Sequence, residues 1–133
     1  MKQFCWPVRV YYEDTDSGGV VYYANYLKFM ERARTEWLRE LGYEQDVLLQ
    51  EYSLVFVVRS VQIDYLQPAR FNDALTVTVQ VAELGGASIK LEQLIRRANT
   101  HEALCQAVVK IVCVNTTSFK PVAIPQKLKT KIQ

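Results

Sequence analysis

Apolar side chains recur at helical spacing between residues 24 and 41, and at alternating spacing through much of the rest of the chain. In the first of these segments the charged residues fall largely outside the apolar stripe, which predicts one amphipathic helix of about eighteen residues. Asn25 is its expected N-cap, and Gly42 stands where a left-handed C-terminal cap would lie. The stripe consists of Leu27, Met30, Ala33, Trp37, Leu38 and Leu41.

Five segments rich in valine, isoleucine and tyrosine predict strands. The first, WPVRVYYED, begins at Trp6 and has Pro7 near its start, where the missing N–H does least harm. The pair Gly85-Gly86 predicts a turn between the third and the fourth strand, and a short helix is expected around 46–51. The other four expected strands are 53–66, 75–81, 89–97 and 103–114.

A helix that must bury one stripe and a sheet that must bury one face are both satisfied when they pack together. The predicted fold class is therefore α+β, with the helix held against a largely antiparallel sheet. The length of 133 residues fits one domain, 1–133. Apolar residues on the sheet's other face and at its edges favour association, so a homo-oligomer is expected. In the proline-containing tail after Phe119, three lysines are expected to be solvated: Lys127, Lys129 and Lys131.

The composition limits the partners and the location of the protein. Lysine and arginine number 16 against 14 aspartate and glutamate, so a net charge of +2 offers no strong attraction to nucleic acid. No apolar run approaches the ~18 residues of a membrane span, and the N-terminus lacks the features of a signal peptide. A cytoplasmic protein without a membrane span is expected. The cysteines lack metal-ligand spacing and are expected to be reduced packing residues: Cys5, Cys105 and Cys113.

The stretch YYEDTDSGGVVYYANY, residues 11–26, holds most of the candidate chemistry. Asp14, Asp16 and Gly19 fit the first, third and sixth places of a calcium loop. However, Asn25 stands where the bidentate glutamate is required, and a strand-like run replaces the incoming helix. No lysine follows the glycines, so a phosphate-binding P-loop is a still weaker match. The sequence therefore predicts no metal site here.

The chain has a single histidine, His101, which is expected in a solvated turn. This removes most zinc, Ser-His and Cys-His mechanisms, and leaves a carboxylate as the candidate base or nucleophile. The predicted strand ends near Asp14 and the predicted helix begins near Ala24, so the carboxylates face the free N–H groups of the helix start. Such groups could stabilise an oxyanion on a substrate carbonyl. The equally weighted alternative is that Asp14 or Asp16 only caps a turn.

Residues 8–39, VRVYYEDTDSGGVVYYANYLKFMERARTEWLR, closely resemble the N-terminal signature of hot-dog-fold acyl-CoA thioesterases of the 4-hydroxybenzoyl-CoA thioesterase type. More narrowly, they are similar to the YbgC group associated with the Tol-Pal system. The likeness continues through FVVRSVQIDYLQPARFNDAL, VCVN and KPVAIP, and so covers nearly the whole chain. It implies one long central helix wrapped by a five-stranded antiparallel sheet, sheets that continue across a dimer, active sites at the dimer interface, and a dimer of dimers.

The same resemblance implies hydrolysis of acyl-CoA thioesters to a free acid and CoA, without a metal or organic cofactor. It assigns the catalytic carboxylate, as nucleophile or general base, to Asp16 and makes Asp14 a structural partner of the turn. Many YbgC members have histidine where this chain has Tyr23, whereas the hydroxybenzoyl-CoA enzymes have tyrosine there and offer its backbone N–H to the thioester carbonyl. Asp16 and Tyr23 are therefore the predicted catalytic pair. Because thiolate leaves readily, strong general-acid help is less necessary.

Secondary roles follow less directly, and an ordinary strand residue is the equal alternative for each. Val58 and Arg59 are predicted to line the acyl or pantetheine channel. Ser88 and Lys90 are predicted to meet the CoA arm across the interface. These four residues are the substrate-binding candidates. Glu31 and Arg34 stand three residues apart on the helix and are expected to form a surface ion pair.

Two other classes of function compete with hydrolysis. A non-catalytic module that binds acyl-CoA or acyl carrier protein is the first, with Tyr23 marking lost catalysis. Asp16 argues against it, because a carboxylate beside the thioester adds little to the binding of an anionic ligand. A structural partner of an envelope complex is the second. The sequence leaves two thiols open, CoA and the phosphopantetheine of a carrier protein. The YbgC resemblance suggests contact with phospholipid-synthesis enzymes at the inner membrane.

Overall fold

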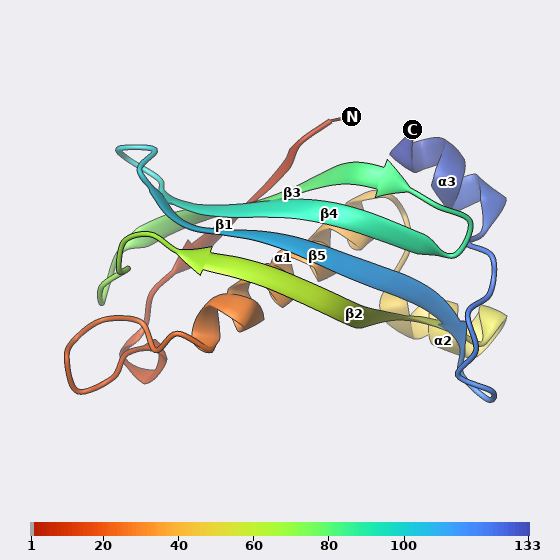
Figure 1. Cartoon of the computed structure of the whole chain (residues 1–133), viewed down its shortest axis with the longest axis horizontal. Helices are drawn as coiled ribbons and strands as arrows, with labels where there is room; N and C mark the ends of the chain where they lie inside the picture. The colour runs from red at the N-terminus through yellow and green to blue at the C-terminus, as the bar shows by residue number, and fades with distance from the viewer. Residues whose placement is uncertain (1) are drawn as a thin grey trace.

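One five-stranded sheet and one long helix dominate the computed structural model, which describes residues 2–133 (Figure 1). The strand order β1-β3-β4-β5-β2 leaves β1 and β2 at the edges. The helices are α1 (Asn25–Glu40), α2 (Gln45–Tyr52) and α3 (Gln126–Ile132), with a 3-10 turn η1 (Tyr12–Asp14). The strands are β1 (Phe4–Arg9), β2 (Leu54–Tyr65), β3 (Ala74–Leu84), β4 (Ser88–Arg97) and β5 (Ala103–Asn115).

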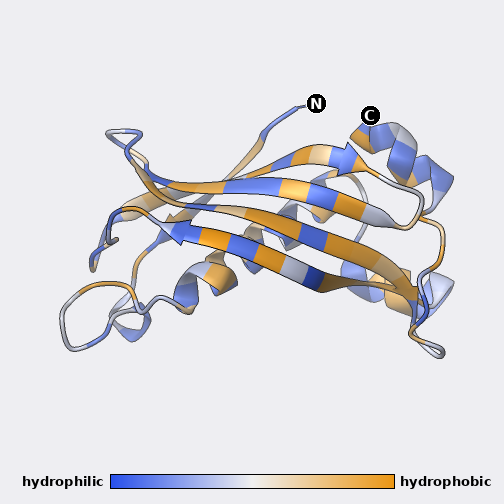
Figure 2. Cartoon of the chain, in the orientation of Figure 1, coloured by the Kyte–Doolittle hydropathy of each residue, from blue (hydrophilic) through white to orange (hydrophobic). Residues whose placement is uncertain are grey.

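Every pair of neighbouring strands is antiparallel, and α1 crosses one face of the sheet (Figure 1). The α+β class and the five strands predicted from the sequence are therefore confirmed. Alternation is the cause: in β4, Ile89, Leu91 and Ile95 are fully buried, while Lys90 and Glu92 between them point away from the core. Figure 2 shows apolar and polar residues alternating along β2 and β4.

The buried stripe of α1 differs in part from the predicted one. Tyr26, Phe29 and Met30 are buried at its N-terminal half, whereas Leu27 is 40% exposed. The buried positions are still three or four residues apart, so the helix keeps one apolar face. In its first turn that face holds Tyr26 in place of Leu27. Each fully buried large side chain of this kind contributes roughly 1.5–3 kcal/mol. The helix is therefore held to the sheet mainly by apolar burial.

Arg34 does not form the predicted surface ion pair with Glu31. Its Nη1 donates to Oε1 of Gln93 on β4 at 2.9 Å, and Nε2 of Gln93 donates to the Met30 carbonyl at 3.2 Å. Burial lowers the pKa of Arg34, with Glu31 a smaller opposing influence. The prediction was wrong because a buried amide on β4 satisfies the guanidinium, and sequence spacing along one helix does not show a partner on the sheet.

The predicted cap is found at the C-terminal end of α1 and not at its N-terminal end. Ala24, not Asn25, precedes the first helical residue, and no side-chain hydrogen bond caps it. At the other end Gly42 has φ +91°, as expected. Its N–H donates to the Arg39 carbonyl at 2.9 Å, and the Tyr43 N–H donates to the Leu38 carbonyl at 2.9 Å. These two bonds form a Schellman motif, which closes the helix.

The first strand ends at Arg9, five residues before the predicted end at Asp14. The Val10 N–H donates instead to the Asp73 carbonyl at 3.0 Å, and η1 follows. The C-terminal tail also differs from its prediction. Its lysines lie on α3, which buries Leu128 and Ile132 against the core. The four-residue spacing of those two side chains was the available signal, and the lysines between them obscured it.

The cysteine and histidine predictions are largely confirmed. Cys105 and Cys113 are buried, and burial raises the pKa of the Cys105 thiol to about 12. Cys5 is exposed, so its assignment as a packing residue was wrong. His101 is exposed in a turn with φ +60°. Among residues 2–133, no helix combines the length and the apolar character needed to cross a bilayer.

Candidate active site

The loop between η1 and α1 is a narrow turn tied by backbone hydrogen bonds. The Asp16 N–H donates to the Val20 carbonyl at 2.9 Å, and the Gly19 N–H donates to the Asp16 carbonyl at 3.0 Å. Gly19 has φ +76°, a conformation that favours glycine. The Val21 N–H donates at 2.8 Å to the Ala69 carbonyl, on the segment between β2 and β3. The loop is therefore closed on itself and tied to the rest of the fold through Val21.

Asp16 lies at the exposed tip of this loop with its carboxylate half engaged. Its Oδ1 accepts the Gly18 N–H at 2.8 Å, and a Cβ on Gly18 would lie 3.2 Å from that oxygen. The other carboxylate oxygen has no protein partner among residues 2–133. Asp16 thus stabilises the turn with one oxygen and offers the second to an incoming molecule. The two interpretations left open by the sequence are compatible.

Asp14 has a purely local set of partners. Its Oδ2 accepts the Tyr11 N–H at 2.8 Å. Its carbonyl accepts the Tyr22 N–H at 2.9 Å and the side-chain Nδ2 of Asn25 at 2.9 Å. The buried Asn25 side chain was predicted to cap the helix, but through this bond it links the beginning of α1 to the loop. Asp14 and Asn25 together hold the loop against the helix start.

The first amide groups of α1 are left open. The Asn25 N–H donates to the Tyr22 carbonyl at 2.8 Å, but the N–H groups of Tyr23 and Ala24 have no partner within the described chain. Helix N-termini carry such unpaired donors and a partial positive charge. A carbonyl oxygen that gains negative charge would be stabilised there. The geometry therefore places an exposed carboxylate and an open helix start on the same short loop.

Four tyrosines surround this helix start: Tyr22, Tyr23, Tyr26 and Tyr65. The Tyr65 hydroxyl, from the end of β2, donates to the Tyr23 carbonyl at 3.2 Å. Burial raises the pKa values of Tyr26 and Tyr65, and a hydrogen bond with Tyr23 raises that of Tyr22. The hydroxyls of Tyr22, Tyr26 and Tyr65 therefore stay protonated at neutral pH. The local sequence pattern does not single out Tyr65, because its partner lies 42 residues away.

The other predicted site residues lie elsewhere on the sheet. Val58 is 48% exposed and Arg59 is the unpaired residue of a β-bulge, both on the edge strand β2. Ser88 and Lys90 line a hollow of about 440 Å³ on the face of the sheet away from α1. Lys110 lines the same hollow and pairs directly with Lys90 across β4 and β5. Two lysines side by side repel each other. Glu83 also lines the hollow, with its Oε1 3.8 Å from the Lys90 Nζ, and offsets part of that repulsion. Within the described chain, the charged side chains of the lining are thus two lysines and one glutamate, which leaves a positive balance suited to an anion.

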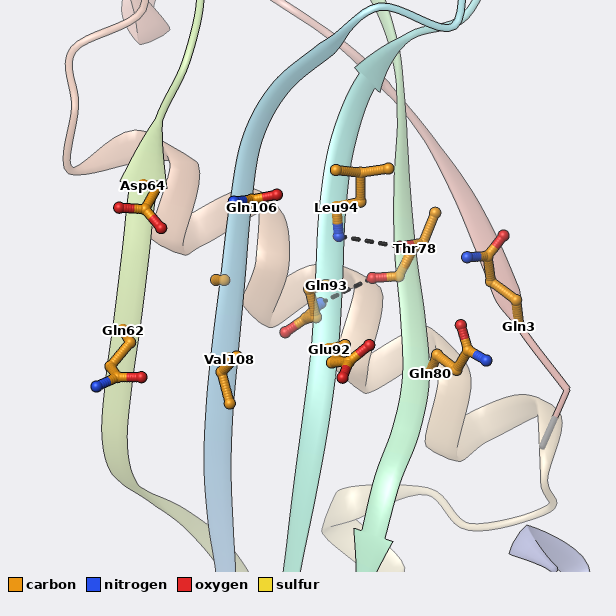
Figure 3. A pocket seen from close by; sticks show the side chains of 11 residues that line it. Gln3, Gln62, Asp64, Thr78, Gln80, Glu92, Gln93, Leu94, Gln106 and Val108 are labelled. Atoms are coloured by element: carbon orange, nitrogen blue, oxygen red, sulfur yellow. Dashed lines mark hydrogen bonds between the residues drawn. The ribbon is translucent and has the colours of Figure 1, made fainter.

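A second hollow of about 350 Å³ lies on the same face (Figure 3). Figure 3 shows glutamines and acids along neighbouring strands, with α1 behind the sheet. Its described lining carries no lysine or arginine, so it does not suit a phosphate. The polar side chains are Gln3, Gln62, Gln80, Gln106, Asp64 and Glu92, beside the buried Thr78 and Gln93.

Comparison with known proteins decides the family. A family model for the thioesterase-like superfamily matches residues 10–132. The chain belongs to this superfamily. It is 52% identical over 126 residues to the acyl-CoA thioesterase YbgC of Haemophilus influenzae, a match that covers 95% of this chain and 91% of that protein. It is 45% identical to the acyl-CoA thioester hydrolase YbgC of Escherichia coli, covering 94% and 92%.

Solved structures of the superfamily agree with this fold. A probable thioesterase from Bartonella henselae has a TM-score of 0.88 at 36% identity, with 93% of this chain and all of that chain covered. A 1,4-dihydroxy-2-naphthoyl-CoA thioesterase from Synechocystis has a TM-score of 0.91 at 24% identity, covering 98% and 96%, and so supports the fold alone. The chain is a member of the YbgC group, as its resemblance indicated.

Within one chain, the thioesterase-like fold keeps the two parts of the predicted site apart. The Asp16 loop lies at the left-hand end of the sheet in Figure 1, and the turn before Ser88 and Lys90 lies at the right-hand end. One chain therefore does not bring Asp16 and Tyr23 together with Ser88 and Lys90.

Proposed function

We propose that this chain is an acyl-CoA thioesterase that hydrolyses acyl-CoA thioesters to a free acid and CoA. The observation that carries the proposal is the half-engaged Asp16 carboxylate on a loop that is tied to the open start of α1. Relatives at 52% and 45% identity bear the names acyl-CoA thioesterase and acyl-CoA thioester hydrolase, which supports the substrate class. A carrier-protein thioester presents the same reacting group and is the second candidate substrate.

The reaction begins when the thioester carbonyl oxygen accepts the Tyr23 N–H at the start of α1. The free oxygen of Asp16 then either attacks the carbonyl carbon or removes a proton from a water that attacks it. The C–S bond breaks, and CoA leaves as a thiolate that takes up a proton. If Asp16 attacked directly, water would next cleave the resulting anhydride and restore the carboxylate. Both routes consume one water and release one acid and one thiol.

The CoA arm requires a second chain in this proposal. The edge strand β2 is twelve residues long, and its second half is exposed, with Val58 and Val61 at 48% and 37%. An exposed edge of this length readily pairs with another strand. If two copies of β2 paired antiparallel about a two-fold axis, the end of one chain that carries the β3–β4 turn would meet the end of its partner that carries the Asp16 loop. The partner's hollow, with its Ser88 and Lys90, would then approach this chain's Asp16.

Lys90 and Lys110 would serve the phosphates of CoA in that arrangement, because they present two cations on one face of the sheet. Val58 and Arg59 lie on the pairing edge itself, where they would border the acyl or pantetheine channel. We infer a homo-oligomer built on such a dimer, with a dimer of dimers as its assembly. The YbgC resemblance supports a cytoplasmic enzyme that contacts phospholipid-synthesis enzymes and serves the Tol-Pal system.

Replacement of the catalytic carboxylate tests the proposal most directly. Asp16→Asn keeps the size of the side chain and removes its charge, so kcat for CoA release should fall at least ~100-fold on a panel of short and long acyl-CoAs. Asp46→Asn, at the exposed start of α2, is the matched control and should retain activity. Unchanged turnover in Asp16→Asn would sink the assignment. Tight acyl-CoA binding by the wild-type chain without Asp16-dependent turnover would favour the non-catalytic binding module.

A mixing arm of the same experiment tests the shared site. Asp16→Asn chains are refolded together with chains that carry both Lys90→Ala and Lys110→Ala. In a mixed dimer one of the two sites keeps both its aspartate and its partner's lysines, so the mixture should exceed the summed activities of the separate variants. No gain on mixing would contradict a site that combines Asp16 of one chain with the lysines of its partner.

A further inference from the structure

The start of α1 contains two successive peptide groups that are both anchored by their carbonyls. The Tyr22 carbonyl accepts the Asn25 N–H at 2.8 Å, and the Tyr23 carbonyl accepts the Tyr65 hydroxyl at 3.2 Å. On the opposite side of each planar peptide stands an N–H group that finds no partner in residues 2–133: that of Tyr23 in the first peptide and that of Ala24 in the second. Because a peptide is planar, holding its carbonyl also fixes the direction of its N–H.

The two anchors differ in origin. Asn25 belongs to the helix itself, whereas Tyr65 is the last residue of β2 and is paired with Cys105 in the sheet. A hydrogen bond from a strand does not move with the loop. The second peptide, between Tyr23 and Ala24, is therefore held by the scaffold.

The Tyr65 side chain is 44% exposed, and its covered side packs against two other tyrosine rings. It meets the Tyr23 ring edge to face, with centroids 6.2 Å apart and planes at 87°, and the Tyr26 ring at 5.4 Å. Tyr26 is buried, and its hydroxyl accepts the Ala69 N–H at 3.0 Å. Aromatic contacts of this geometry stabilise a fixed ring orientation. The hydroxyl of Tyr65 is thus presented to the Tyr23 carbonyl by a chain of packed aromatic groups.

We propose that Tyr65 is a positioning residue for the proposed hydrolysis: its hydroxyl orients the Tyr23–Ala24 peptide so that the Ala24 N–H joins the Tyr23 N–H as a second donor to the thioester carbonyl. The inference rests on the proposed function. Successive N–H groups at a helix start point along the helix axis in similar directions, so both can reach one oxygen. A hydroxyl that donates to a peptide carbonyl also polarises that peptide and strengthens its N–H as a donor.

The effect should appear in the transition state more than in substrate binding, because negative charge on the carbonyl oxygen develops there. Loss of a direct donor to such an oxygen costs about 10²–10³ in kcat. Tyr65 acts through a second group, so its loss should cost less, on the order of tenfold. Binding of CoA itself should change little.

The test compares Tyr65→Phe with Tyr52→Phe, an exposed tyrosine at the end of α2. Both variants lose one hydroxyl and keep the ring. Tyr65→Phe should lower kcat about tenfold and leave KM within about twofold, while Tyr52→Phe should match the wild type. If Tyr65 only packed against its neighbours, the phenylalanine ring would preserve kcat as well, and the inference would be overturned.

An amide NMR measurement on the unliganded protein gives a readout that does not depend on turnover. Loss of the hydroxyl should shift the Ala24 amide signal, whose peptide loses its anchor, and leave the Tyr23 amide close to its wild-type position. Similar shifts at both amides, or at neither, would overturn the positioning role even if kcat fell.

The outcomes separate this inference from the proposed function. Asp16-dependent hydrolysis with full activity in Tyr65→Phe overturns the inference and leaves the function standing. Full activity in Asp16→Asn overturns the function, and the inference falls with it. A tenfold loss in Tyr65→Phe together with a selective Ala24 shift supports both.

Discussion

The two ends of α1 are built in opposite ways. At the C-terminal end, the Gly42 and Tyr43 N–H groups pair with the last carbonyls of the helix, and the Lys131 Nζ on α3 donates to the Leu41 carbonyl at 2.8 Å. At the N-terminal end, Ala24 offers no side-chain cap, and its own N–H and that of Tyr23 have no partner in the described chain. One end is closed and the other is open.

The closed end of α1 contributes to stability, whereas the open end leaves N–H donors for the proposed reaction. Capping is worth about 1 kcal/mol at a helix N-terminus, so an uncapped start forgoes stability that a serine or aspartate would supply. The open donors stand beside the Asp16 loop, where the proposed reaction needs them, whereas the closed end lies far from it (Figure 1). Stability is thus given up where the proposed function would use the unpaired groups.

A negative charge placed at the open N-terminal end of α1 should have the largest effect on activity. Ala24→Asp places a carboxylate at the helix start, where it should raise the free energy of unfolding by about 0.3–1 kcal/mol. The same charge should repel the developing oxyanion and lower kcat/KM for acyl-CoA by more than about tenfold. Ala24→Asn, of equal size, isolates the steric share of the loss. Equal activity in the two variants would contradict an electrostatic role for this end.

A disruption of the closed end should affect stability alone. Gly42→Ala forces a side chain into φ +91°, and its Cβ would lie 3.0 Å from the Lys131 Nζ, so unfolding by urea should show a loss of about 1–2 kcal/mol. Gly86→Ala, where a Cβ meets nothing within 4 Å, is the control and should cost less than about 0.5 kcal/mol. At temperatures where the variant is folded, its kcat should equal the wild-type value. A large fall in kcat would mean that the two ends are coupled.

The smallest expected effect concerns Cys105, which is paired with Tyr65 near the open end of α1. Burial raises the pKa of the Cys105 thiol from 9.0 to about 12, so in this window the unfolded chain loses the proton and the folded chain keeps it. Stability from this group is complete below pH 9 and is lost as the pH rises toward 12. Because one unit corresponds to ~1.4 kcal/mol, wild type should lose about 1 kcal/mol more than Cys105→Ala between pH 8 and pH 10.

Urea titrations at both pH values measure this difference, and Cys5→Ala, at an exposed thiol, is the control. Cys5→Ala should keep the alkaline loss of the wild type. If Cys105→Ala loses as much stability as wild type between the two pH values, the buried thiol is not responsible.

Local periodicity predicted most of the fold. The β4 and β5 boundaries agree with the expected strands within about one residue, because one face of each strand is buried and alternation records it. Periodicity did not predict the end of β1 or the helix α3, because long-range contacts determine both. β1 stops at Arg9 because Val10 bonds to Asp73, and α3 exists because Leu128 and Ile132 find apolar partners in the core.

The candidate site divides in the same way. The carboxylate, the glycine turn and the helix start are adjacent in the chain, so the stretch 11–26 already indicated Asp16 and Tyr23. Lys110 was not indicated, because its relation to Lys90 depends on the register between β4 and β5. The predicted pairing of Arg34 with Glu31 was wrong for a similar reason, since its partner Gln93 is brought near only when α1 packs on β4.

Spacing between near neighbours in the chain was enough to predict the α+β class, the long helix, and the loop that joins a carboxylate to the helix start. The residues that complete that loop come from distant parts of the chain and are brought to it only by folding. Tyr65 reaches the Tyr23 carbonyl across 42 residues, and the lysine pair stands at the opposite end of the sheet. Such contacts follow from strand order, register and side-chain packing, which arise only when the whole chain has folded.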